Sequence, residues 1–377
     1  MKLQQRGIVL PALTALSATL FLAGASLDAE AAKLRLATDS GTQGSPAGDT
    51  LDKWSRLIEE KSGEELEVEV YYQNELGGQQ EVFDLLVAGG IDMMLSWPMT
   101  SYDKRIGVIY TPYMTLSWDE AIQAYGSDGW VNELLGGIFA DIGLKFFGPW
   151  PEGFNGVASR DRYALDVESA DGLTVRTMPV FPAPQTMQAL GYQTAAIDWG
   201  EVYTALQTGV VDGEAGNVIY WPYEYFRDTL DYYVHTKHFF MTGILTMNMD
   251  SFERLSVEHQ QVVSEAAREI MEQQFVDARA RDEHYIAKAQ EDGMEYFALP
   301  EETLDAFARR DRGDLVDVSF FGVVAFAELD GVHPEFLRRQ IHDPLDDEGG
   351  LGPARPAVGV DRRDVREGAV DRAVDRR

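Results

Sequence analysis

One arginine ends a short apolar segment in a position suited to binding an anion. Leu173 and Val175 belong to this segment, Arg176 closes it, and three prolines follow within eight residues. Proline fixes φ and donates no backbone hydrogen bond, so the strand must end there. A guanidinium offers a planar fork of donors that matches a carboxylate. The segment therefore predicts an anion-binding Arg176, with a structural ion pair to an acidic group as the alternative.

Residues 172–217, which surround this arginine, alternate between strand and helix patterns. After the first strand, a helix over 185–190 ends at Gly191, and a second helix ends at Gly209 before a strand at 210–211. Such alternation is typical of a parallel α/β unit. In these sheets ligands bind at the carboxyl ends of the strands, where Arg176 falls.

A resemblance to a known family rests on two runs of this stretch, GLTVR and WGEVYTALQTGVVDG. Both are similar to the solute-binding proteins of tripartite ATP-independent periplasmic (TRAP) transporters, of the dicarboxylate-binding (DctP) type. In that family the arginine that closes the strand clamps the substrate carboxylate, which implies this role for Arg176. An asparagine shortly after the turn assists it, which implies the same for Asn217. The resemblance extends from about residue 34 to residue 295.

Aromatic residues near the expected strand ends are further candidates for the site. Trp97, Trp150 and Trp199 lie at or near such ends, and Tyr220 opens an aromatic cluster. Ligand pockets are mainly lined by apolar and aromatic side chains. Packing in the core is the alternative for each of them.

The Gly- and Pro-rich segment 148–154 is expected to cross between two lobes. Asn155 follows it, at a position where many members of the family carry a second arginine. This departure implies that only one ligand carboxylate is strongly clamped, with Asn155 as a candidate ligand contact.

The expected fold is α/β, a two-lobed periplasmic binding protein fold with a ligand cleft between the lobes. A helical pattern over 256–290 is longer than usual globular helices and resembles the family's long helix across both lobes. A coiled-coil helix is the alternative, but the apolar residues of this segment do not follow a strict heptad repeat. Lobe I is expected over 32–152 with about 241–280, and lobe II over 153–240 with about 281–310.

The two ends of the chain are expected to lie outside these lobes. Residues 1–31 combine a positive start, an apolar run and a small-x-small cleavage pattern, which predicts a signal peptide and a periplasmic protein. An uncleaved anchor is the alternative. Residues 343–377 carry short charged repeats instead of apolar periodicity, which predicts a disordered, atypical tail, either added or frameshifted.

The composition restricts the partners. The formal net charge is −31, which argues against nucleic acid or an anionic membrane surface as a partner. A local cationic site must therefore overcome the global field to bind an anion. Cysteine is absent, so the fold uses neither disulfides nor thiolate metal sites.

Catalytic patterns are weak in this sequence. His235 and His238 near Asp231 suggest a metal site, and Glu201 with Asp212 suggests an acid and base. Alternatively, the two histidines are exposed or hydrogen-bonded within the fold. Glu201 can also serve, with Asp198, to cap the start of a helix.

We therefore expect a binding protein rather than an enzyme, with no cofactor and no metal. Its expected partners are a small organic acid and the TRAP membrane permease subunits. A periplasmic hydrolase and a ligand-sensing partner of a receptor are the alternatives.

Signal cleavage is expected near Ala31, because Ala29 and Ala31 frame the cleavage pattern after the apolar run. N-terminal sequencing of the exported protein should find a terminus near Ala32. An intact Met1 recovered from the membrane fraction would contradict this prediction.

Overall fold

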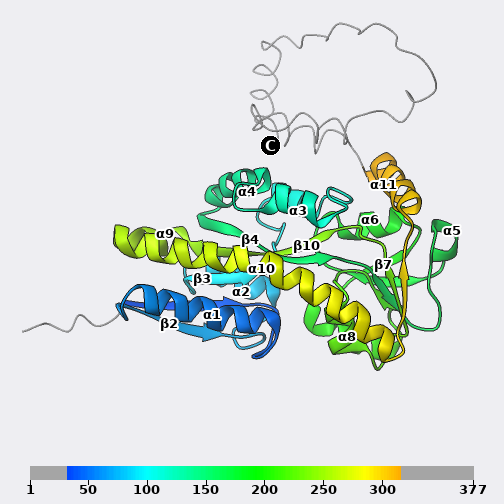
Figure 1. Ribbon diagram of the computed structural model, residues 1–377, viewed down its shortest axis with the longest axis horizontal. Helices are drawn as coiled ribbons and strands as arrows, with labels where there is room; N and C mark the ends of the chain where they lie inside the picture. The colour runs from blue at the N-terminus through cyan, green and yellow to red at the C-terminus, as the bar shows by residue number, and fades with distance from the viewer. Residues whose placement is uncertain (1–31, 316–377) are drawn as a thin grey trace, which may run out of the picture. The chain divides into compact units, whose positions relative to one another are not determined.

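Residues 32–315 are described in this computed structural model of the protein (Figure 1). The expected signal peptide, 1–31, and the expected tail, 343–377, lie outside the described residues. Within 32–315, no helix combines the length and the apolar character of a membrane span.

Five strands form the first sheet, in the order β2-β1-β3-β10-β4. β1 pairs in parallel with β2 and β3, whereas β10 runs antiparallel between β3 and β4. The carboxyl ends of β1 and β3 therefore meet at one edge of the sheet. The strands are β1 (Ala32–Thr38), β2 (Leu66–Tyr71), β3 (Met93–Ser96), β4 (Leu144–Phe154) and β10 (Phe240–Asn248).

Six strands form the second sheet, in the order β11-β9-β5-β8-β6-β7. β6 pairs in parallel with β7 and β8, which confirms the predicted parallel unit around Arg176. The strands are β5 (Val157–Ser159), β6 (Thr174–Thr177), β7 (Gln193–Ala196), β8 (Gly213–Glu214), β9 (Tyr232–His235) and β11 (Glu295–Ala298).

The strand expected at 210–211 lies three residues further along the chain, as β8. Gly209 ends the preceding helix in the left-handed conformation, as predicted. The backbone N–H groups of Val210 and Val211 then both bond to the carbonyl of Ala205, so the helix-ending turn occupies these residues. β8 can begin only at Gly213.

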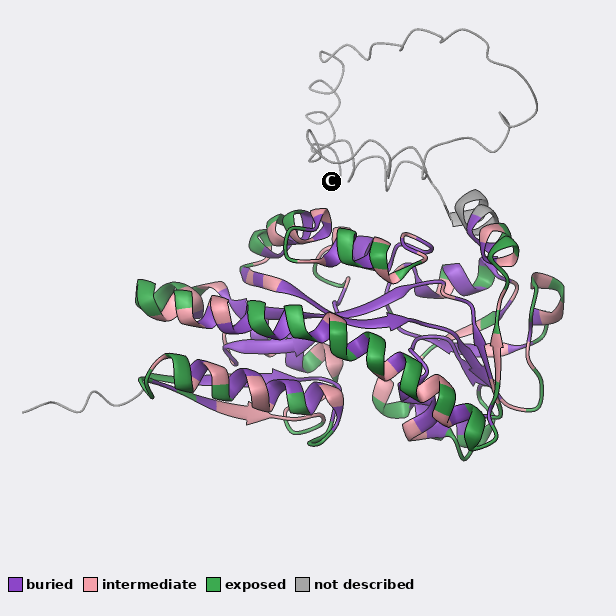
Figure 2. Ribbon diagram, in the orientation of Figure 1, coloured by how far each residue is buried: buried purple, intermediate pink, exposed green. Residues whose placement is uncertain are grey.

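Helices cover the sheets and turn their exposed faces outward, while the strands are largely buried (Figure 2). The main core surrounds fully buried Leu36, Trp54 and Phe83, and smaller clusters form around Val175 and Val202. The α/β class is thus confirmed. The helices are α1 (Pro46–Lys61), α2 (Gln79–Val87), α3 (Trp118–Tyr125), α4 (Trp130–Asp141), α5 (Val167–Ala170), α6 (Ala183–Ala189), α7 (Val202–Thr208), α8 (Tyr220–Phe226), α9 (Met249–Arg254), α10 (Val257–Glu291) and α11 (Glu301–Leu315), with 3-10 helices η1 (Lys104–Tyr110) and η2 (Trp199–Glu201).

The long helix α10 packs on elements of both sheets, as expected. It begins after Ser256, whose Oγ accepts a hydrogen bond from the backbone N–H of His259. α10 contacts β4 of the first sheet and both α8 and β11 on the side of the second (Figure 1). One continuous helix therefore links the two parts of the fold.

The Gly- and Pro-rich segment 148–154 belongs to β4 rather than to a connection between sheets. Pro149 and Pro151 are tolerated because β4 lies at the edge of its sheet and its pairing with β10 contains two register shifts. The chain leaves the first sheet only after Phe154. The lobe boundaries drawn from the sequence remain predictions.

Asn155 joins the two connections between the sheets. Its Oδ1 accepts a hydrogen bond from the backbone N–H of Phe239 at 2.8 Å, and its Nδ2 donates to the carbonyl of Ala215 at 3.4 Å. Its own backbone carbonyl accepts from the N–H of Lys237. The side chain is fully buried, so these bonds are shielded from water.

The Asn155→Ala variant should lower the free energy of unfolding by about 1–3 kcal/mol, because the buried N–H of Phe239 loses its acceptor. Urea denaturation measures this change. The Gln273→Ala variant, on the exposed face of α10, serves as a control and should remain within about 0.5 kcal/mol of the wild type. Equal stabilities of the two variants would contradict the role of Asn155.

Candidate functional site

A small cavity lies at the carboxyl ends of parallel strands from both sheets. Ser40 follows β1, Trp97 follows β3, Arg176 lies near the end of β6, and Asn217 follows β8. The cavity has a volume of about 30 Å³. The residues that line it are Ser40, Gln79, Trp97, Arg176, Met178, Trp199, Asn217 and Trp221. Four of the predicted site residues are thus brought together: Trp97, Arg176, Trp199 and Asn217.

The Arg176 guanidinium is buried, with 2% of the side chain exposed. Its Nε donates to the carbonyl of Ile197 at 2.8 Å. Its Nη1 lies 3.9 Å from Oε2 of Glu214 and has no hydrogen-bond partner within the described residues. The structural ion pair that the sequence allowed as an alternative is therefore present. It leaves Nη1 of the guanidinium without a hydrogen-bond acceptor among the described residues.

Glu214 is the acidic partner and is itself shared. Its Oε2 accepts hydrogen bonds from the backbone N–H of Gly216 at 3.0 Å and from Nδ2 of Asn217 at 2.8 Å. Burial raises the pKa of Glu214, and the charge of Arg176 opposes this shift. Asn217 thus holds the carboxylate that faces the arginine.

Gly216 is required by this arrangement. A Cβ at this position would stand 2.6 Å from Nη1 of Arg176, well inside van der Waals contact. The glycine therefore leaves the space that the guanidinium occupies.

Two tryptophans of the cavity wall share one carboxylate. Nε1 of Trp97 donates to Oε2 of Glu152, and Nε1 of Trp221 donates to Oε1, each at 2.7 Å. The indoles of Trp199 and Trp221 make an edge contact at 5.2 Å between ring centroids. Burial raises the pKa of Glu152, and the nearby Arg281 cation opposes the shift. Glu152 therefore fixes the orientation of an aromatic wall.

A third buried carboxylate, that of Asp39, stands beside the cavity. Asp39 precedes the cavity-lining Ser40 and is 4% exposed. Its Oδ2 accepts from Oγ of Ser40 at 3.2 Å, while its Oδ1 has no hydrogen-bond partner in the part of the chain that is described. Burial raises the pKa of Asp39 to about 7.

Three predicted site residues are not among those that line the cavity. Trp150 donates from Nε1 to Oγ1 of Thr50 at 3.1 Å and supports Trp97 only through an edge contact. Tyr220 packs against Trp221 and Tyr285. Asn155 joins the connections between the sheets, as described above.

The residues considered for a metal site have other partners. His235 bonds to the carbonyl of Phe154, and His238 bonds to that of Ala215. Burial lowers the pKa of each histidine to about 4. Among the described residues, no group of His, Cys, Asp and Glu side chains is arranged to hold a metal ion.

The residues considered as acid and base also have structural surroundings. Oδ2 of Asp212 accepts from the backbone N–H of Thr174, and Glu201 is exposed. The expected side-chain cap between Asp198 and Glu201 is absent. The helix there opens with a 3-10 turn, in which the N–H of Glu201 bonds to the carbonyl of Asp198 instead.

The sequence did not mark Ser40, Gln79 and Met178 for the site, nor Glu152 behind it, and it offered Trp221 only as a member of the aromatic cluster that Tyr220 opens. The rule that selected Arg176 applies equally to Asp39 and Ser40, which follow the parallel strand β1. Glu152 lies within β4, and nothing in its sequence neighbourhood marks it as the acceptor for two indoles.

Comparison with known proteins places these features in context. A model of the bacterial extracellular solute-binding proteins of family 7 (DctP) matches residues 38–312. The chain is 26% identical over 248 residues to the ectoine-binding periplasmic protein TeaA of Halomonas elongata, a match that covers 64% of this chain and 72% of TeaA.

Solved structures show the same fold. A TRAP periplasmic solute-binding protein from Haemophilus influenzae with bound L-gulonate superposes with a TM-score of 0.73 at 18% identity, covering 82% of this chain and 98% of the other. A TRAP periplasmic solute-binding protein from Chromohalobacter salexigens with bound D-glucuronate superposes with a TM-score of 0.70 at 21% identity. The match covers 81% of this chain and 97% of the other. This likeness confirms the expected two-lobed periplasmic binding protein fold.

Asp39 should make the stability of the protein depend on pH. Its pKa is raised from 3.8 to about 7 by burial, so the fold favours the protonated form. The contribution of Asp39 to stability is therefore retained below pH 3.8 and falls as the pH rises to about 7. The Asp39→Asn variant removes this ionisation, so its melting temperature should exceed that of the wild type by more at about pH 8 than at about pH 4. An equal difference at both values, measured by scanning calorimetry, would contradict this.

Proposed function

Because the chain belongs to the bacterial extracellular solute-binding protein family 7, we propose that it captures a small organic acid through the guanidinium of Arg176. It is a periplasmic solute-binding component of a TRAP transporter rather than an enzyme. The unused Nη1 of Arg176 beside the cavity is the observation that carries the proposal. A carboxylate bound there would form a charge-assisted hydrogen bond that Glu214, at 3.9 Å, does not supply.

The charges around the cavity favour a ligand with a single carboxylate. Arg176 is the cationic side chain among the described residues that line it, and Asp39 and Glu214 are buried nearby. A second carboxylate of the ligand would face these acidic groups without a cation of its own. A polar or cationic remainder would meet them favourably.

The relatives are consistent with such ligands. TeaA is named for ectoine, which carries one carboxylate and one cationic amidine, and the two solved structures hold the monocarboxylates L-gulonate and D-glucuronate. We therefore infer that monocarboxylates with polar or zwitterionic remainders bind better than C4-dicarboxylates.

Binding requires the cavity to enlarge. A volume of about 30 Å³ accommodates one or two water molecules but no sugar acid. The lobes, proposed at 32–152 with 241–280 and at 153–240 with 281–310, would open and close about the connections that Asn155 joins. The closed form would then dock on the membrane permease subunits.

Replacing Arg176 should weaken ligand binding strongly. Truncating a buried charged contact costs about 2–5 kcal/mol, so Arg176→Ala should lose well over tenfold in affinity. Arg176→Lys should also bind poorly, because an ammonium cannot reproduce the fork. Calorimetry with ectoine, D-glucuronate and succinate measures both effects, and succinate should be the weakest ligand of the wild type.

The control for this experiment accounts for Glu214, which Arg176→Ala leaves buried without its cation. The double variant Arg176→Ala/Glu214→Gln removes both charges and should be at least as stable as the single variant. Affinity that survives in either variant, with the fold intact by circular dichroism, would remove Arg176 from the site.

A further inference from the structure

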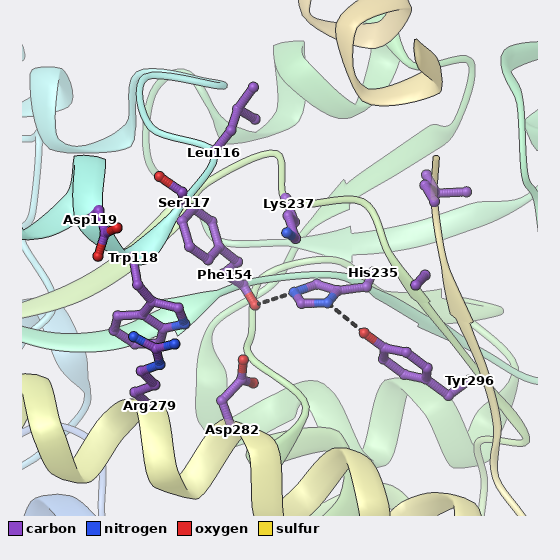
Figure 3. A pocket seen from close by; sticks show the side chains of 12 residues that line it. Leu116, Ser117, Trp118, Asp119, Phe154, His235, Lys237, Arg279, Asp282 and Tyr296 are labelled. Carbon is purple, nitrogen blue, oxygen red and sulfur yellow. Dashed lines mark hydrogen bonds between the residues drawn. The ribbon is translucent and has the colours of Figure 1, made fainter. Parts of the chain in front are cut away.

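A second and larger cavity, with a volume of about 460 Å³, shares no lining residue with the first. Its volume lies within the range of small-molecule sites. Figure 3 shows that its walls come from the loop and helix start around Trp118, from the β9–β10 connection at Lys237, from β11 at Tyr296 and from α10. It therefore lies beside the connections between the two sheets.

Asp282 is the unusual group in this cavity. Its carboxylate points from α10 into the space (Figure 3), although the residue is 8% exposed. Among residues 32–308, whose side chains are described, it forms neither a hydrogen bond nor an ion pair. Burial raises its pKa to about 7, and Arg281 and Lys237 oppose the shift. A buried carboxylate without a partner is costly, so this position would gain from a cation.

The cavity also holds cationic groups. Nζ of Lys237 lies 5.3 Å from the centroid of the Phe154 ring and forms no ion pair within the described residues. Arg279 rises from α10 one turn before Asp282, and its Nε pairs with Glu283 at 3.4 Å. Lys237 is therefore the lining cation that has no ion pair among the described residues, whereas the exposed Arg279 pairs through its Nε.

The other titratable groups of the cavity are already satisfied or lie at its exposed rim. The Nε2–H of His235 donates to the carbonyl of Phe154 at 3.1 Å, and its Nδ1 bonds to the hydroxyl of Tyr296 at 2.7 Å (Figure 3). Burial keeps this histidine neutral by lowering its pKa to about 4. Asp119 is exposed, in the first turn of α3.

We propose that this cavity binds a small zwitterion of the amino-acid class, whose ammonium pairs with Asp282 and whose carboxylate pairs with Lys237. The two protein charges have opposite signs and line the same cavity, so a ligand with a single charge would satisfy one and oppose the other. Trp118, Phe154 and Tyr296 supply aromatic surface for the ligand's carbon chain and its ammonium. This site is separate from the organic-acid cavity and does not depend on the function proposed for it.

The test uses glycine, β-alanine and 4-aminobutyrate, which differ in the spacing of their two charges, against acetate and ethylammonium. Calorimetry and saturation-transfer NMR are carried out on the mature chain in the Arg176→Ala background, in which affinity at the first cavity should be well over tenfold weaker. At least one amino acid should bind saturably and more tightly than either singly charged probe. Asp282→Asn and Lys237→Met should each weaken it about tenfold or more.

Asp277→Asn is the matched control, since Asp277 is exposed on the same helix and does not line the cavity. It should leave binding unchanged. Asp282→Asn should melt no lower than its parent, because it removes an unpartnered buried charge. If it does not fold, the half-buried Lys237 still provides the decisive variant. No saturable binding up to about 50 mM, or binding that survives both substitutions, would overturn the proposal.

Discussion

The burial of one guanidinium constrains the architecture of this site. Arg176 keeps 2% of its side chain exposed, and a charge removed from water must be compensated within the protein. Glu214 supplies a charge at 3.9 Å, but Gly216 and Asn217 share its Oε2, and Gly216 must lack a Cβ for Nη1 to fit. Compensation is therefore incomplete. A ligand carboxylate would complete the compensation of the Arg176 charge. Arg176 can therefore pair with Glu214 and still bind an anion.

The fold delivers this arrangement through two sheets whose parallel strands end at one cavity. β1 and β3 bring Ser40 and Trp97, and β6 and β8 bring Arg176 and Asn217. Each set alone would form half of a binding surface. Because α10 and the connections joined by Asn155 link the sheets, the size of the cavity depends on their relative position. In the proposed function, the strand ends would contact the ligand and the connections would allow the cavity to open.

The sequence predicted strand ends better than side-chain directions. Arg176 and Trp97 follow from the rule for parallel sheets, and Asn217 from the family resemblance. Trp150 is not among the residues that line the cavity: it lies within β4, and its indole donates to Thr50. Tyr220 and Trp221 are neighbours in α8, and only tertiary packing decides that Trp221 lines the cavity. Buried acidic residues are still harder to predict from the sequence. The chain has 63 Asp and Glu residues, and their sequence surroundings do not reveal which few are buried.

The strong net charge of −31 makes this distinction between buried and exposed acids important. Exposed charges more than about 10 Å apart are largely screened at ordinary ionic strength, so most of the acidic surface acts weakly on a bound ligand. Buried groups are screened much less. Buried Arg176, Glu214 and Asp282, with half-buried Lys237, therefore act more strongly on the local potential of their cavities than the exposed acids do. An acidic protein can bind an organic anion under these conditions because the few unscreened charges, and not the many screened ones, face the ligand.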